Sequence, residues 1–188
     1  MGLNRKLYHP KQLNEPEKVN MSELESLNLN LSLMDSVIKA TLEGLAMTEI
    51  VPDAVGVSRF MSTPRELSVL VGLHGIRNGN MTMNLSEHTA CFLASRFMGE
   101  EMTELDDDVI DAVCEIGNMV AGQLKELLLD TDYGFKTISL PALIFGANYN
   151  LYHLKNITTV SVTFEINEIS IVRIRDKFFT TTIAMMEQ

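Results

Sequence analysis

The sequence predicts a two-layer α/β domain of the α+β type, in which long helices pack on one mainly antiparallel sheet. Hydrophobic patterns follow one another along the chain in the order helix, strands, helix, helix, strands. The connections between the strand patterns are mostly short enough for antiparallel pairing. Of the 188 residues, 46% are apolar and 21% are charged, which suits a soluble globular domain with one substantial core.

The first 20 residues contain two prolines, several asparagines and mixed charge, and they predict an N-terminal extension without regular structure. The domain itself is expected over residues 21–188. Its first helix should begin near Met21, where Ser22 and Glu25 fit a capping box, and should end near Met47. The expected core face of this helix is apolar at helical spacing: Leu27, Leu31, Met34, Ile38, Leu42 and Leu45.

Three short β patterns follow the first helix. Residues 55–61 predict one strand, and residues 66–73 and 80–85 predict the two arms of a hairpin. Asn78 and Gly79 lie between these arms, and the Asn-Gly pair readily adopts positive φ in tight hairpin turns. We therefore expect left-handed backbone at this turn.

Two further helices are predicted in the middle of the chain. The first covers residues 87–98, with Ser86 as its N-cap and Gly99 at its end. The second is the longest amphipathic helix of the sequence, over residues 106–130, and the aspartates at its start complement the helix dipole. Its expected core face consists of Val109, Val113, Ile116, Val120, Leu124 and Leu127.

The opposite face of this central helix carries a line of four residues, Asp111, Glu115, Asn118 and Gly122. A glycine inside a helix costs about 1 kcal/mol relative to alanine. Close approach of a neighbouring element or of a partner protein would offset that cost. On spacing alone, a solvated helix face with a packing glycine is the simpler interpretation.

The C-terminal part of the chain reads mainly as strands. Residues 143–145 predict a short strand soon after Pro141, and residues 158–166 alternate apolar and polar side chains. Residues 169–174 are expected to pair with that alternating strand. Residues 178–186 predict the last strand of the sheet.

Charge and cysteine content bear on the class of partner and the compartment. The net charge is −10, and the 15 lysines and arginines are spread along the chain, so neither nucleic acid nor an anionic membrane surface is an expected partner. No apolar run is long enough for a membrane span. Cys91 and Cys114 predict buried free thiols, and the N-terminus lacks the pattern of a secretory signal. These features favour a cytoplasmic protein.

Familiar catalytic and cofactor motifs do not occur in the sequence. The glycines at positions 72, 75 and 79 are not followed by Gly-Lys-Ser/Thr, so they do not form a phosphate-binding loop. The four histidines are scattered without the spacing of zinc ligands, and there is no Gly-x-Ser-x-Gly pattern. The motifs therefore point to no zinc site and no phosphate-binding loop.

Glu115 and Asn118 make chemical sense together if the rest of their site belongs to another protein. An amide has a donor and an acceptor, so it can hold one water molecule in a fixed orientation. A carboxylate one turn away can pair with a lysine of the partner. A helix that presents both groups could complete a hydrolytic site that already contains the electrophile and the metal.

The chain resembles the CheC, CheX and FliY phosphatases of bacterial chemotaxis, whose signature is Asp/Ser-x3-Glu-x2-Asn-x22-Pro. Asp111, Glu115, Asn118 and Pro141 match every fixed position of this signature. The likeness is clearest over residues 67–147. One full motif rather than two is more like CheX than CheC.

This resemblance implies a CheC/CheX-like fold and a phosphatase that hydrolyses the phospho-aspartate of a CheY-like response regulator. Asn118 would orient the attacking water, Glu115 would contact the active-site lysine of the regulator, and Asp111 and Pro141 would be structural. The Mg²⁺ ion would belong to the regulator, with no cofactor on this chain. The resemblance also implies a homodimer joined partly through its sheets.

Other interpretations of the same residues remain open. A non-catalytic module could use the central helix to dock a receiver domain or a flagellar switch protein, and an unrelated dimeric scaffold could bury the same face in a self-interface. Glu25 and Asn28 in the first helix repeat the Glu-x2-Asn spacing. They are either a degenerate second site or a chance match.

Overall fold

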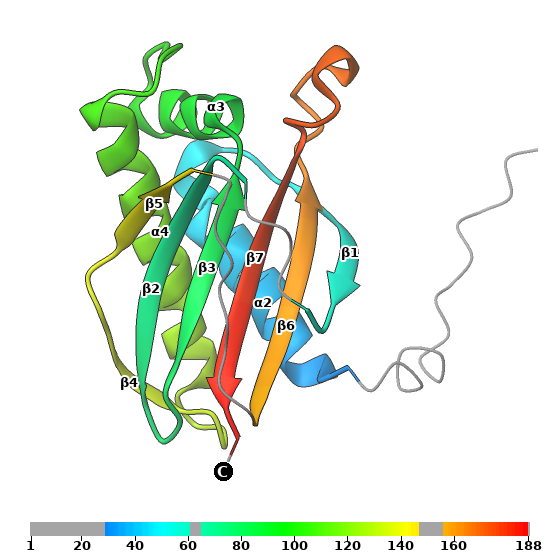
Figure 1. The fold of residues 1–188 in the computed structure, drawn as a ribbon, viewed down its shortest axis with the longest axis vertical. Coiled ribbons are helices and arrows are strands. Elements are labelled where there is room, and N and C mark those ends of the chain that lie inside the picture. The colour runs from blue at the N-terminus through cyan, green and yellow to red at the C-terminus, as the bar shows by residue number, and fades with distance from the viewer. Residues whose placement is uncertain (1–28, 61–64, 147–155, 188) are drawn as a thin grey trace, which may run out of the picture.

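The computed structural model describes residues 29–60, 65–146 and 156–187. The described residues form three α-helices, two short 3₁₀ turns and one seven-stranded sheet (Figure 1). The helices and turns are α2 (Leu31–Gly44), η1 (Ala46–Thr48), α3 (Glu87–Met98), α4 (Asp107–Leu128) and η2 (Ile171–Arg173). The strands are β1 (Asp53–Ser58), β2 (Leu67–Gly75), β3 (Gly79–Leu85), β4 (Phe135–Ile138), β5 (Ala142–Phe145), β6 (Ile157–Glu165) and β7 (Phe178–Met186).

The strands follow the order β1-β6-β7-β3-β2-β4, and β5 also pairs with β2. Every strand pair among the described residues is antiparallel, as the sequence predicts. The short strands β4 and β5 share the outer edge of β2, because Leu73 pairs with Ile138 and Val69 pairs with Leu143. This arrangement brings the segment that contains Pro141 to one edge of the sheet.

The helices α2 and α4 pack side by side against one face of the sheet, and α3 lies across one end of it (Figure 1). Most of the buried side chains are apolar, and several threonines and serines are buried with them. Phe164 and Phe179, on neighbouring strands, stack with their ring centroids 5.2 Å apart. The hydroxyl of Thr41 in α2 donates to the hydroxyl of Thr181 in β7 over 3.1 Å. The predicted two-layer architecture is therefore confirmed.

Elements whose ends are fixed by local hydrogen bonds match the prediction closely. The N-cap Ser86 accepts a hydrogen bond from the Thr89 amide (3.2 Å), and α3 ends at Gly99 with φ of +77°. In α4, the Asp106 carboxylate accepts from the Val109 amide (2.9 Å). Strand β7 has the predicted bounds.

The first helix differs from its prediction. Leu29 and Asn30 are not helical, and α2 begins at Leu31, where the Asn30 side chain accepts a hydrogen bond from the Leu33 amide (3.0 Å). The buried face is also shifted relative to the predicted one: Leu33, Val37, Ala40, Thr41 and Gly44. Small residues lie on this face because α2 packs very closely on α4. The proposed capping box at Ser22 and Glu25, and the 1–20 extension, lie outside the described residues.

The prediction of left-handed backbone at the hairpin turn is wrong. Asn78 and Gly79 are not among the described residues with positive φ. Gly79 is needed for a different reason: a Cβ atom there would collide with the carbonyl oxygen of Ala184 on the neighbouring strand. Close approach of β7, and not a left-handed turn, explains this glycine.

The strand predicted over residues 169–174 is also wrong. Ser170 caps the short 3₁₀ turn η2 by accepting from the Val172 amide (3.4 Å). Ile171 and Val172 are 68% and 88% exposed, so they have no sheet face to cover. A further difference is β4, which begins at Phe135 and has no counterpart in the predicted strands.

Candidate active site

Helix α4 is held in place by two close backbone contacts. A Cβ atom on Gly117 would lie 2.6 Å from Cγ1 of Val69, so the α4 backbone rests directly on β2. A Cβ atom on Gly44 would lie 2.7 Å from Cα of Val120, so α2 crosses α4 with backbone against backbone. Because α4 is fixed on these two sides, its remaining face has a defined orientation toward solvent.

The buried face of α4 agrees largely with the amphipathic pattern. Val109, Val113, Ile116, Val120 and Leu124 are fully buried. Leu127 is an error of the prediction, because it is 36% exposed and Leu128 is buried in its place. In the last turn the apolar stripe is therefore shifted by one residue relative to the prediction.

The predicted line of Asp111, Glu115, Asn118 and Gly122 faces away from the core. Asp111 and Glu115 are exposed, and Asn118 and Gly122 are half-buried. Glu115 and Asn118 are one helical turn apart, so their side chains are neighbours on the helix surface. Within the described parts of the chain, neither makes a hydrogen bond or an ion pair. Both polar groups are thus available to a partner.

Gly122 lacks the internal contacts that explain the other two glycines of the helix pair. A Cβ atom at position 122 would meet no atom within 4 Å, whereas one at Gly44 or Gly117 would collide with a neighbour. Of the two explanations that the sequence allowed, close approach of an element of the same chain therefore finds no support. Among the described residues, no contact compensates the cost of about 1 kcal/mol for a mid-helix glycine.

The electrostatic character of this line is anionic. No described lysine or arginine forms an ion pair with Asp111 or Glu115; Lys125, further along α4, pairs instead with Glu126 (3.1 Å). Burial raises the pKa of the Cys114 thiol, and the negative charge of Asp111 raises it further. Cys114 therefore favours the neutral thiol, and the line attracts cationic groups.

The remaining predicted site residues lie elsewhere. Pro141 is half-buried between β4 and β5, at the edge of the sheet. Next to it, the Ser139 amide donates to the Gly72 carbonyl (2.9 Å) and the Ser139 hydroxyl accepts from the Gly72 amide (2.8 Å). The motif proline thus lies where the strand pairing along β2 passes from β4 to β5. Glu25 and Asn28 fall outside the described residues.

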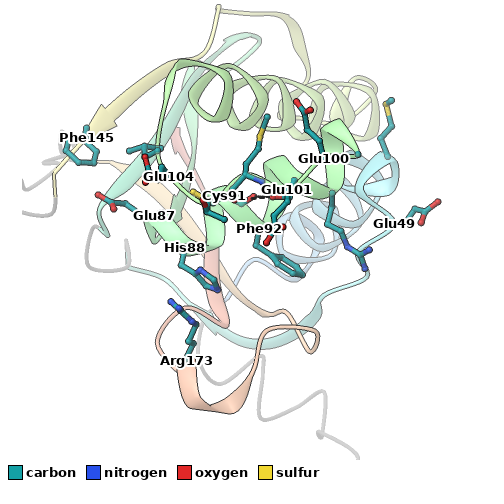
Figure 2. A pocket seen from close by; sticks show the side chains of 17 residues that line it. Glu49, Glu87, His88, Cys91, Phe92, Glu100, Glu101, Glu104, Phe145 and Arg173 are labelled. Atoms are coloured by element: carbon teal, nitrogen blue, oxygen red, sulfur yellow. Dashed lines mark hydrogen bonds between the residues drawn. The ribbon is translucent and has the colours of Figure 1, made fainter.

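A hollow of about 1250 Å³ lies beside α3 and is separate from the α4 line. Figure 2 shows His88 and Phe92 on its α3 wall, with Arg173 of η2 opposite His88. Neither Glu115 nor Asn118 lines it. The hollow and the line on α4 are therefore different parts of the surface.

The described residues contain no group of three or more His, Cys, Asp or Glu side chains that could hold a metal ion. Among the described helices, none combines the length and the apolar character needed to cross a bilayer. The amphipathic pattern does not single out the two packing glycines, Gly44 and Gly117, which hold α4 in place. A glycine inside a helix is unfavourable, so the sequence does mark both positions as unusual. It does not show which neighbouring residue requires the glycine.

The sequence has relatives among known proteins. Residues 67–165 match the family model described as chemotaxis phosphatase CheX. The CheY-P phosphatase CheX of Thermotoga maritima is 30% identical over an alignment of 101 residues, and the match covers 48% of this chain and 64% of that relative. The match therefore spans a little under two thirds of the length of this curated relative.

Solved structures share the fold. A CheC-like superfamily protein from Shewanella sp. PV-4 has a TM-score of 0.70 at 21% identity, over 85% of this chain and 100% of that chain. A chain of the CheX-CheY-BeF₃-Mg²⁺ complex from Borrelia burgdorferi has a TM-score of 0.66 at 24% identity, over 82% of this chain and 97% of that chain. In these relatives, as in this chain, the helices pack on one open sheet.

Proposed function

Because the chain belongs to the CheX family of chemotaxis phosphatases, we propose that it hydrolyses the phospho-aspartate of a CheY-like response regulator. The observation that carries this proposal is the pair formed by the exposed Glu115 and the half-buried Asn118, which has the family spacing and lacks any partner among the described residues. A relative named CheY-P phosphatase and a CheX-CheY complex among the structural relatives support the choice of partner.

Asn118 is proposed to position the water molecule that attacks the phosphorus. Its amide NH₂ can donate to the phosphoryl group while its carbonyl oxygen accepts a hydrogen bond from the water. The water then lies in line with the P–O bond that breaks, and phosphate leaves as the aspartate carboxylate is regenerated. Positioning of this kind needs no charge on Asn118, and it suits a residue that is half-buried and therefore limited in its motion.

Glu115 is proposed to pair with the lysine of the receiver active site. The carboxylate is exposed and no described cation neutralises it, so it can form a charge-assisted hydrogen bond with an incoming ammonium group. This pair would fix the register of α4 on the receiver. The Mg²⁺ ion of the reaction belongs, in this proposal, to the regulator, where it would neutralise charge on the phosphoryl oxygens.

The direct test is a time course of phosphate loss from phosphorylated CheY-like regulators, with and without the protein. The proposal expects faster loss of the phospho-aspartate from at least one regulator, in proportion to the amount of protein added. Stable binding of the phosphorylated regulator without any acceleration would instead assign the α4 face to a non-catalytic docking module.

The family resemblance also leads us to propose that the protein is a homodimer. Size-exclusion chromatography with light scattering tests this oligomeric state.

Replacing Glu115 by alanine is expected to weaken binding of the regulator about 10-fold to 100-fold, because a charge-assisted hydrogen bond contributes about 1.5–3 kcal/mol. Glu43→Ala is the matched control, since it removes an exposed carboxylate from another helix, α2. Affinity is measured by titration with a regulator that carries beryllofluoride in place of the phosphoryl group. Wild-type affinity in Glu115→Ala would contradict the assigned role.

A further inference from the structure

Gly122 is the one described glycine inside a helix that the fold does not explain. Its backbone has ordinary helical φ, and a Cβ atom there would meet nothing within 4 Å. Alanine at this position is therefore compatible with the free chain and would favour the helix. A residue that the fold does not need, in the line that carries Glu115 and Asn118, points to a requirement that arises only when a partner is bound.

Helix geometry shows what a side chain at position 122 would do. Every Cα–Cβ bond in a helix leans toward the N-terminus, so a residue covers the surface over the preceding turn. The preceding turn here carries Asn118, four residues earlier. A long side chain at position 122 would lie over the Asn118 amide, and even a methyl group would raise the helix surface beside it.

Asn118 has a short side chain, so the helix surface beside it must allow a close approach of the partner. To reach a phosphoryl group inside another protein, a short amide needs the partner surface to come close to the α4 backbone. Neighbours that are longer than asparagine hold the partner away. Glu115 does not hold the partner away because, in the proposed function, its side chain extends into the partner. Gly122 does not hold the partner away because it has no side chain.

We propose that Gly122 is a specificity-determining contact, at which the receiver domain packs directly on the α4 backbone one turn beyond Asn118. This inference rests on the proposed function, since it names the contact that sets the distance between Asn118 and the phosphoryl group. The volume of the side chain at position 122 then determines how closely any receiver can approach. A displacement of about 1 Å at a reacting group can lower the rate about 100-fold.

The test uses Gly122→Ala and Gly122→Leu in the full chain, with Glu43→Leu on the exposed face of α2 as the control for adding a leucine to a helix surface. For each variant, the melting temperature, kcat/KM for the phosphorylated regulator, and the Kd for its beryllofluoride form are measured. Gly122→Ala should raise the melting temperature by about 2–4 °C. It should also lower kcat/KM about 10-fold and weaken the affinity in parallel. Gly122→Leu should lower both much further, and Glu43→Leu should change neither.

Wild-type values of kcat/KM and Kd in Gly122→Ala would overturn the proposed contact between the receiver domain and the α4 backbone at Gly122. The two readouts separate this outcome from a failure of the proposed function. If the wild-type chain binds the regulator without accelerating phosphate loss, the proposed function fails, and a weakened Kd in Gly122→Ala still supports the contact. If the wild-type chain does not bind the regulator at all, both proposals fail.

Discussion

Replacing Asn118 by alanine is expected to lower the catalysed loss of phosphate from the regulator by at least about 100-fold while leaving the fold intact. The loss is large because the amide is proposed to hold the attacking water, and a misplaced nucleophile costs about that factor. The fold should tolerate the change because Asn118 makes no hydrogen bond or ion pair within the described residues and lies outside the core. Stopped-flow measurement of phosphate release gives the rate, and circular dichroism gives the melting temperature.

The matched control for this prediction is Gln123→Ala. Gln123 is another amide of α4 and is also half-buried, but it lies about 140° around the helix from Asn118. Its replacement should leave phosphate release unchanged. Binding of the beryllofluoride form should survive in Asn118→Ala, since the Glu115 contact remains. Undiminished phosphate release in a folded Asn118→Ala protein would rule out the proposed mechanism.

The outward placement of the candidate site residues could be predicted from the sequence because it depends on the geometry of a single helix, whereas their choice as a site rests on the resemblance to the CheC, CheX and FliY signature. The spacing of Glu115 and Asn118 places them on one face, and a 22-residue helix keeps that face continuous. Local caps also gave α3 its exact bounds, since Ser86 and Gly99 satisfy the helix ends without help from the rest of the chain. Features that are decided within a few residues are the ones that sequence patterns predict well.

The errors arise where tertiary contacts outweigh local preference. Residues 169–174 are rich in β-branched and aliphatic side chains, but no sheet position is available to them and Ser170 closes a 3₁₀ turn instead. Gly79 looked like a turn residue, whereas the approach of β7 is what excludes a side chain there. The sequence shows that a glycine is present but not which neighbour requires it.

The same limit applies to the three glycines that determine how α4 is held and what it can meet. Gly44 faces Val120, Gly117 faces Val69, and Gly122 faces open space. From sequence alone all three are merely unfavourable helix residues. Gly44 and Gly117 are required by the packing of the fold, whereas the open space at Gly122 is available to a partner. Substitution by alanine should therefore affect them in different directions.

Replacing Gly44 by alanine is expected to destabilise the protein by about 2–3 kcal/mol, the range typical of overpacking a core. The new Cβ atom would lie 2.7 Å from Cα and 2.8 Å from N of Val120, and backbone atoms cannot be relieved by a change of rotamer. The helices α2 and α4 must separate instead, which opens the contacts of Val37 and Val120 in the core. Denaturant unfolding followed by circular dichroism measures the loss.

The control is the identical substitution in the neighbouring helix. Gly122→Ala adds the same methyl group to a helix without a collision, so only the helix preference of alanine acts, and it favours the folded state by up to about 1 kcal/mol. Gly44 does not have positive φ, so backbone strain is not an alternative cause of the loss in Gly44→Ala. Equal stability of the two alanine variants would mean that α2 and α4 can move apart freely, and α4 would then lack the rigid support on which the placement of Glu115 and Asn118 depends.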